Sequence, residues 1–145
     1  MAQKISTGST SNAEEPDNRE EEKEQKKEVI VQYIIVRNDA YRNQDRSFSA
    51  ILQHTCSAAA AVIHKHYHHK YTREYLKDLD GMKKKVFQVN DEKELFALEN
   101  KLVSNEIDYK MWIKQPGNCA TCIATRPYPM SEISSYFKNV KLYKK

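Results

Sequence analysis

Cysteine is scarce in this chain of 145 residues, which contains only Cys56, Cys119 and Cys122. Three thiols argue against the disulfide framework that stabilises many small secreted domains. Cys119 and Cys122 have CxxC spacing, but the chain has no second pair that would complete a zinc site. They also run into an apparent strand, which would point the two sulfurs to opposite faces. We therefore expect packing cysteines, with no bound metal and no cofactor.

Long apolar runs are also missing. No stretch approaches the roughly 18 apolar residues of a membrane-spanning helix. The amino-terminal segment lacks the apolar core of a secretory signal and the Arg-rich amphipathic pattern of an organelle transit peptide. These absences favour a cytoplasmic protein that does not enter a membrane.

Residues 1–28 contain neither an aromatic residue nor an apolar cluster. Such a segment cannot bury enough apolar surface to offset the entropy cost of ordering it. We therefore predict a disordered charged tail at 1–28 and one folded domain at 29–145.

Charge is divided unevenly between these two parts. The tail carries 5 Lys or Arg and 8 Asp or Glu, which leaves 19 basic and 12 acidic residues, net +7, for the domain. A basic domain suits a polyanionic partner such as RNA. A Lys-rich surface that is merely well solvated explains the charge about as well.

The central element is a predicted helix over 49–66, preceded by the strongly β-prone run 29–36. Four consecutive alanines at 58–61 make its surface thin, so a sheet or a ligand can come close to the helix backbone. We expect its apolar face to pack on the sheet. The predicted contact joins Ile51, Ala58, Ala59 and Val62 of the helix to Ile34, Val36, Val86 and Ile123 of the sheet.

The remaining pattern predicts a helix over 71–79 with Thr72 as a possible cap, and a strand over 86–89. A helix then starts at Asn90 or Asp91, with Glu94 placed for a capping box. Strands at 109–114 and 120–126 form a hairpin, and a last helix starts near residue 131. The order β-α-α-β-α-β-β-α predicts a single α/β domain with a four-stranded mixed sheet, one parallel crossover and helices packed over it.

The central helix closes in a cluster of four histidines: His64, His66, His68 and His69. Only His64 and His68 have i, i+4 spacing, and no HExxH glutamate lies between them. An exposed polar helix end is therefore a better interpretation than a metal site.

The chain resembles the archaeal/eukaryotic-type (type 2) peptidyl-tRNA hydrolase family from about residue 29 to 144. The resemblance rests on VRND after the first strand, the Ala-rich helix, KKKVFQVNDEKEL and the TCIATRPYP ending, in this order. It is closest to the branch of peptidyl-tRNA hydrolase domain-containing proteins. It implies hydrolysis of the ester between a nascent peptide and tRNA, with tRNA or peptidyl-tRNA as the partner.

The resemblance also shows where the chain departs from the main family. The family's Lys at the helix start reads Ala50 here, and the Gln and His of A-Q-x-x-H-A read His54 and Ser57. The Asp of D-A-G-x-T reads Gln115, and the threonine segment is missing. Because glutamine cannot accept a proton from water, a rearranged or degraded site is expected.

We predict His54, Gln115 and Asn118 as catalytic residues, with His54 as the one candidate base. A helix histidine that makes only a surface hydrogen bond is the plainer alternative. The predicted tRNA-binding residues are Arg37, Arg42, Arg46, Lys114 and Arg126, which we expect near the 115–118 loop. The alternative function is a catalytically inactive tRNA-binding or protein-interaction module on the same fold.

Overall fold

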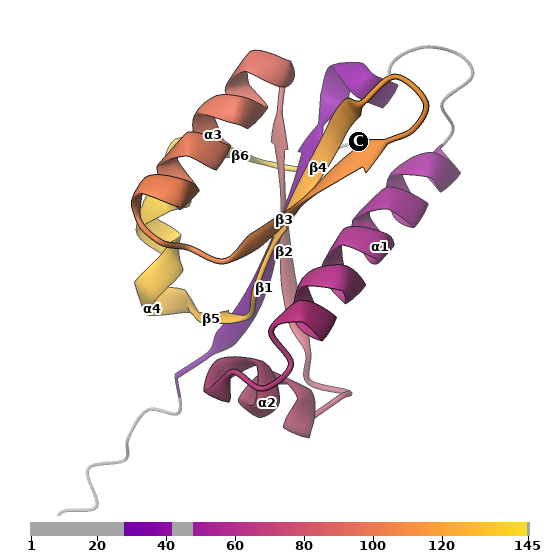
Figure 1. The fold of residues 1–145 in the computed structure, drawn as a ribbon. Helices are drawn as coiled ribbons and strands as arrows, with labels where there is room; N and C mark the ends of the chain where they lie inside the picture. Colours follow the sequence, from indigo (N-terminus) through magenta and orange to yellow (C-terminus); the bar gives the residue numbers. More distant parts are fainter. Residues whose placement is uncertain (1–27, 42–47, 145) are drawn as a thin grey trace, which may run out of the picture.

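The computed structural model describes residues 28–41 and 48–144. A single mixed sheet lies at its centre, with α1 along one face and α3 and α4 on the other (Figure 1). The elements are β1 (Ile30–Arg37), η1 (Asn38–Tyr41), α1 (Phe48–Lys65), α2 (Lys70–Lys77), β2 (Lys83–Val89), α3 (Glu92–Ser104), β3 (Tyr109–Lys114), β4 (Cys119–Thr125), β5 (Tyr128–Pro129), α4 (Met130–Ile133), η2 (Ser134–Phe137) and β6 (Lys141–Leu142). All but the last residue of the predicted tail lies outside the described residues. Within the described ranges, no helix is long and apolar enough to cross a bilayer.

The strands lie in the order β3-β4-β1-β2-β6, and β5 pairs with β1. β1 and β2 are parallel and are joined through α1 and α2, whereas β3 and β4 form an antiparallel hairpin. The predicted α/β class, crossover and hairpin are therefore confirmed. The sheet has six strands rather than the predicted four. β5 and β6 have two residues each, which is too short for an alternating pattern in the sequence.

The helix α1 packs on the sheet through the face that its apolar pattern predicts. Ala58 and Val62 are fully buried against Ile34 and Val36 of β1. The thin Ala-rich surface lets β1 approach the helix backbone closely. The buried Gln32 side chain of β1 uses this space, because its Nε2 donates to the carbonyl oxygen of Ala59 at 3.2 Å.

Two predicted core partners of α1 are wrong. Ile123 is fully buried, but it belongs to the cluster on the opposite face, and Cys122 contacts the α1 cluster instead. Val86 pairs with Ile34 across β1 and β2, yet it is 36% exposed. It stays exposed because α1 lies over β3, β4 and β1 and leaves β2 largely uncovered.

The other face of the sheet is covered by α3. Leu95 and Leu102 of this helix are fully buried against the sheet. The helix begins with the predicted capping arrangement: Asp91 accepts from the backbone N of Glu94 at 2.9 Å, and Glu94 accepts from the backbone N of Asn90 at 2.7 Å. These bonds satisfy backbone donors that the first helical turn leaves without partners.

The helix α2 starts earlier than its sequence suggests. His69 is its N-cap, and the ring Nδ1 accepts from the backbone N of Tyr71 at 3.1 Å. Thr72, the possible cap in the sequence, is instead fully buried. A histidine cap is difficult to recognise from sequence, because Ser, Thr, Asp and Asn are the usual capping residues.

Candidate active site at the loop end of the sheet

Most of the predicted site residues lie at one end of the sheet, which we call the loop end. β1, β2 and β3 finish there, and β4 starts there (Figure 1). The amino end of α1 lies at the same end of the molecule (Figure 1). Ligands of open α/β sheets commonly bind where such strand ends and loops meet.

Arg37 is the last residue of β1 and is held in place by several bonds. Its Nε donates to Asp39 Oδ1 at 2.6 Å and its Nη1 donates to the carbonyl oxygen of Ala120 at 3.0 Å. The hydrogen bond to Asp39 raises the pKa of the Arg37 guanidinium, so its positive charge is secure. The side chain is only 14% exposed. Arg37 therefore joins β1 to the start of β4 and places a partly neutralised charge beside the 115–118 loop.

His54 lies on the α1 side of the loop end. Its Nδ1 is 2.7 Å from the Tyr41 hydroxyl, so one of the two groups donates to the other. Its ring also stacks on Trp112 of β3, with the ring centroids 6.2 Å apart and the planes 27° from parallel. Tyr41 comes from η1 and Trp112 from the middle of β3. These two aromatic residues orient the imidazole, and neither carried a signal in the sequence.

The loop between β3 and β4 contains the other two predicted catalytic residues. Gln115 Nε2 donates to Asn118 Oδ1 at 2.8 Å, and both side chains are exposed. Gly117 has φ of 99° and Asn118 has φ of 49°, a left-handed conformation that these two residue types tolerate best. Lys114, which ends β3, pairs with Cys119 just outside this loop. The structure thus brings Gln115 and Asn118 together and places Lys114 beside them.

The structure does not place the other three predicted tRNA-binding residues beside the 115–118 loop. Arg42 and Arg46 lie outside the described residues. Arg126 follows the far end of β4, so its expected position near the 115–118 loop is wrong. It is 4% exposed, and its Nε donates to Asp108 Oδ2 at 2.9 Å.

Further contacts hold Arg126 in the fold. Its guanidinium lies 3.9 Å from the centroid of the Tyr128 ring, and its Nη1 is 2.9 Å from Nδ1 of His69. Burial, followed by the charge of Arg126, lowers the pKa of His69. Sequence alone could not separate this structural arginine from one that faces solvent.

The two cysteines of the CxxC pair differ in environment. Cys122 is fully buried under α1, and burial raises the pKa of its thiol to about 12. Cys119 is half-buried, 3.8 Å from Nη1 of Arg37. Across the described part of the chain, no group of three or more His, Cys, Asp or Glu side chains could hold a metal ion.

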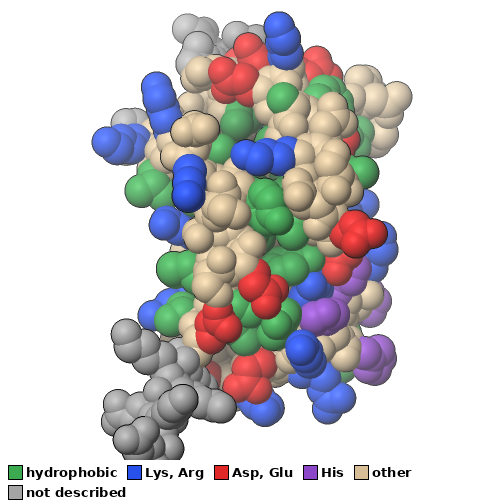
Figure 2. All heavy atoms as spheres, turned by 90° about the vertical axis from the view of Figure 1, so that its left-hand side faces the viewer, with side chains coloured by type: hydrophobic (Ala, Val, Ile, Leu, Met, Phe, Trp, Pro, Cys, Tyr) green, Lys and Arg blue, Asp and Glu red, His purple; other side chains and the backbone are tan. Residues whose placement is uncertain are grey.

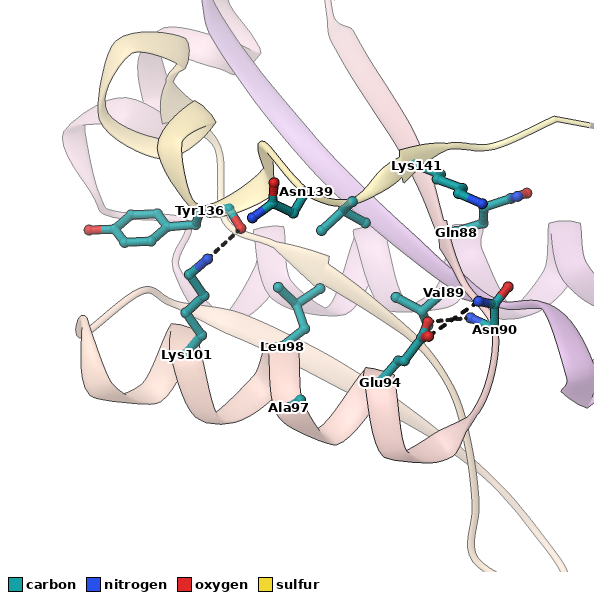
Figure 3. A pocket seen from close by; sticks show the side chains of 11 residues that line it. Gln88, Val89, Asn90, Glu94, Ala97, Leu98, Lys101, Tyr136, Asn139 and Lys141 are labelled. Atoms are coloured by element: carbon teal, nitrogen blue, oxygen red, sulfur yellow. Dashed lines mark hydrogen bonds between the residues drawn. The ribbon is translucent and has the colours of Figure 1, made fainter.

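A hollow of about 340 Å³ lies between α3 and the η2–β6 segment (Figure 3). Lys101 Nζ donates there to the carbonyl oxygen of Tyr136 at 3.3 Å, and Glu94 caps α3 through Asn90. The bond from Lys101 ties the carboxyl-terminal segment to α3. None of the candidate residues of the loop end lines this hollow.

A family model described as peptidyl-tRNA hydrolase PTH2 matches residues 30–143. The chain belongs to this family. Two relatives, each named "Putative peptidyl-tRNA hydrolase PTRHD1", come from Mus musculus and Homo sapiens. Each is 40% identical over 121 residues, which cover 81% of this chain and 84% of the relative.

Two amide side chains occupy the 115–118 loop at the loop end of this chain. An amide, Gln115, stands where the resemblance places a carboxylate, and it is bonded to a second amide, Asn118. Amides can orient a water molecule or stabilise an oxyanion, but they cannot take a proton. His54 stays the predicted base, and its imidazole lies on the α1 side of this end.

Proposed function

We propose that this protein binds peptidyl-tRNA at the loop end of its sheet and hydrolyses the peptide–tRNA ester slowly. The observation that carries the proposal is the convergence of Arg37, His54 and the 115–118 loop at one end of a PTH2-family fold. The names of the mouse and human relatives point to the same reaction. Such a substrate is consistent with the cytoplasmic location expected from the sequence.

The reaction needs a positioned water, a base and donors for the oxyanion. An imidazole has a reference pKa of about 6.5, which suits a base near neutral pH. The stack on Trp112 and the bond to Tyr41 fix the ring of His54, which limits the reorganisation needed before proton transfer. The amides of Gln115 and Asn118 would orient water and the developing oxyanion.

Basic side chains would hold the phosphates of the tRNA acceptor end. Arg37 and Lys114 border the 115–118 loop, and Arg42 and Arg46 belong to the connection between η1 and α1. Log affinity should then fall with log salt by about 0.7 to 0.9 for each phosphate contact. Arg42→Ala with Arg46→Ala should flatten this slope, which filter binding over a salt series measures. An unchanged slope would remove these two arginines from the interface.

The assignment of His54 is tested by turnover of N-acetyl-aminoacyl-tRNA under single-turnover conditions. His54→Ala should slow ester cleavage by about 100-fold or more, while tRNA affinity stays within about threefold. Gln53→Ala, an exposed neighbour on the same helix, is the matched control and should change neither quantity. Equal rates for the parent and His54→Ala would reject the histidine as the base.

The second candidate function is a tRNA-binding module without turnover, and the Gln115–Asn118 amide pair favours it. Gln115→Asp combined with Ala50→Lys returns the two charges that the resemblance assigns to the family's site. A rise in turnover would indicate a site that has lost its catalytic charges. If the parent binds tRNA and shows no cleavage above background, the binding module is the correct function.

A further inference from the structure

A basic surface lies at the opposite end of α1 from the candidate site. It consists of the turn from α1 to α2 together with the exposed side of α2, and we call it the α2 surface. α1 has 18 residues, so this surface is about 27 Å from the amino end of the helix. Figure 2 shows histidine side chains gathered at one end of the molecule, next to Lys and Arg side chains.

Lys and Arg outnumber Asp and Glu on the α2 surface, although an exposed carboxylate, Asp78, follows directly at the end of α2. Residues 64–77 contain four Lys or Arg, one Glu and four His. Lys77 is partly compensated by Glu74, whose carboxylate lies 2.8 Å away, but this pair is exposed and therefore weak. Arg73 is exposed, and the described part of the chain gives its guanidinium no ion pair. The α2 surface thus presents exposed cationic side chains that a negatively charged ligand can contact.

An aromatic ring stands among these cations. Tyr67 is 54% exposed, and its ring meets His68 edge-on with the centroids 5.4 Å apart. A hollow of about 220 Å³ is lined by Tyr67, Arg73, Leu76 and Lys77. The hollow therefore has an aromatic and aliphatic lining on which a flat group could stack, and two cations that could contact a phosphate.

We propose that the α2 surface binds an unpaired nucleotide of the tRNA body, outside the acceptor end. An exposed aromatic ring takes a base by stacking, whatever the identity of that base, and adjacent Arg and Lys side chains contact the backbone phosphates. An acidic protein segment could use the charges, but it would leave the exposed ring of Tyr67 without a function. This inference rests on the proposed function, because it adds a second contact to the same tRNA.

Two contacts at opposite ends of α1, a helix about 27 Å long, have a consequence for substrate choice. An RNA too short to extend along α1 can bind only at the loop end. An intact tRNA is long enough to contact the loop end and Tyr67 together. Linked contacts strengthen binding without changing either one, so intact tRNA should bind more tightly than an isolated acceptor-stem hairpin.

The test compares the affinities of full-length tRNA and an acceptor-stem hairpin at one salt concentration. The parent should prefer full-length tRNA, and Tyr67→Ala combined with Arg73→Gln should weaken full-length binding by roughly 5- to 100-fold. Hairpin affinity should not change in this variant. Tyr67→Phe keeps the ring and should keep the parent affinity.

Phe96→Ala combined with Lys93→Gln is the matched control. It also removes one exposed aromatic ring and one exposed cation, but from α3 on the other face of the sheet. Both RNA affinities should stay at the parent values. An equal loss in this control would mean that general surface charge, and not the α2 surface, sets the affinity.

Two results would overturn the inference in different ways. If the double variant Tyr67→Ala, Arg73→Gln has the same affinity for full-length tRNA as the parent, the α2 surface does not contact RNA. The proposed function then still stands. If the parent binds neither RNA, the proposed function fails as well. A thermal midpoint equal to that of the parent shows that the variant is folded.

Discussion

The two ends of β4 differ in how much of the fold depends on them. At its start, the 115–118 loop is exposed, and one amide–amide hydrogen bond joins Gln115 to Asn118. After its end, Arg126 is 4% exposed and contacts Asp108, His69 and Tyr128. The first end presents polar groups to solvent, and the second uses its charge to hold separate elements together.

This difference explains where the chain can depart from its family. Replacing a carboxylate by Gln115 costs the fold little, because both members of the amide pair are exposed. The Arg126 cluster joins the start of β3, the end of β4 and the start of α2, so a change there affects three elements. Chemistry can therefore change at the loop end while the framework at the other end stays intact.

The largest effect on stability should come from Arg126→Ala. The change removes a buried partner of Asp108 and leaves the Tyr128 ring without its stacked guanidinium. Breaking a buried pair typically costs about 3 to 5 kcal/mol, and because Asp108 is 40% exposed we expect roughly 2 to 4 kcal/mol. Urea unfolding measures this loss.

Gln115→Ala is the control at the other end of β4. Both members of its hydrogen bond are exposed, so the free energy of unfolding should change by no more than about 0.5 kcal/mol. Similar losses for Arg126→Ala and Gln115→Ala would mean that the two ends of β4 contribute equally to stability.

The next largest effect is expected in the contact between α1 and the sheet. Ala58 is fully buried against β1 and β4, so Ala58→Leu should overpack the contact and cost roughly 1 to 3 kcal/mol. Ala60→Leu, at an exposed position of the same helix, should have little effect. Equal stabilities of the two variants would show that Ala58 does not face the sheet.

The smallest effect concerns pH. Burial and the charge of Arg126 lower the pKa of His69 in the fold below its unfolded value of about 6.5. Between these two pKa values the unfolded chain binds a proton that the folded chain does not, so stability falls as pH drops below about 6.5 and the loss is complete below the folded pKa. His69→Asn keeps a capping side chain without titrating, and thermal unfolding from pH 7.5 to 5 should depend less on pH in this variant. Parallel pH profiles of the two proteins would exclude His69 as the source.

Much of the fold follows from sequence patterns, because long elements repeat their signals. The 18 residues of α1 and the buried run of β1 were recognisable for this reason, and the capping role of Glu94 has a fixed spacing. β5 and β6 were missed because two residues give no period. The prediction put Ile123 on the wrong face of the sheet. Side chains alternate between the two faces along a strand, so an error of one residue in the predicted register moves a side chain to the other face.

The candidate site was predicted less completely. The positions of His54, Gln115 and Asn118 came from resemblance, and the structure places all three at the loop end. Tyr41 and Trp112 were missed, because contacts between η1, α1 and β3 depend on packing that no local pattern encodes. For the same reason, the sequence did not indicate that Arg126 is buried.

The central claim is that tRNA binding and rapid turnover are separate properties of this fold. The most direct measurement determines, on one preparation, the affinity for tRNA and the single-turnover rate on N-acetyl-aminoacyl-tRNA, with a PTH2 enzyme that retains the family's Asp as the reference. We predict salt-sensitive binding together with ester cleavage at least about 100-fold slower than that of the reference, because no carboxylate occupies position 115. Cleavage as fast as the reference, or no binding of tRNA, would contradict the claim.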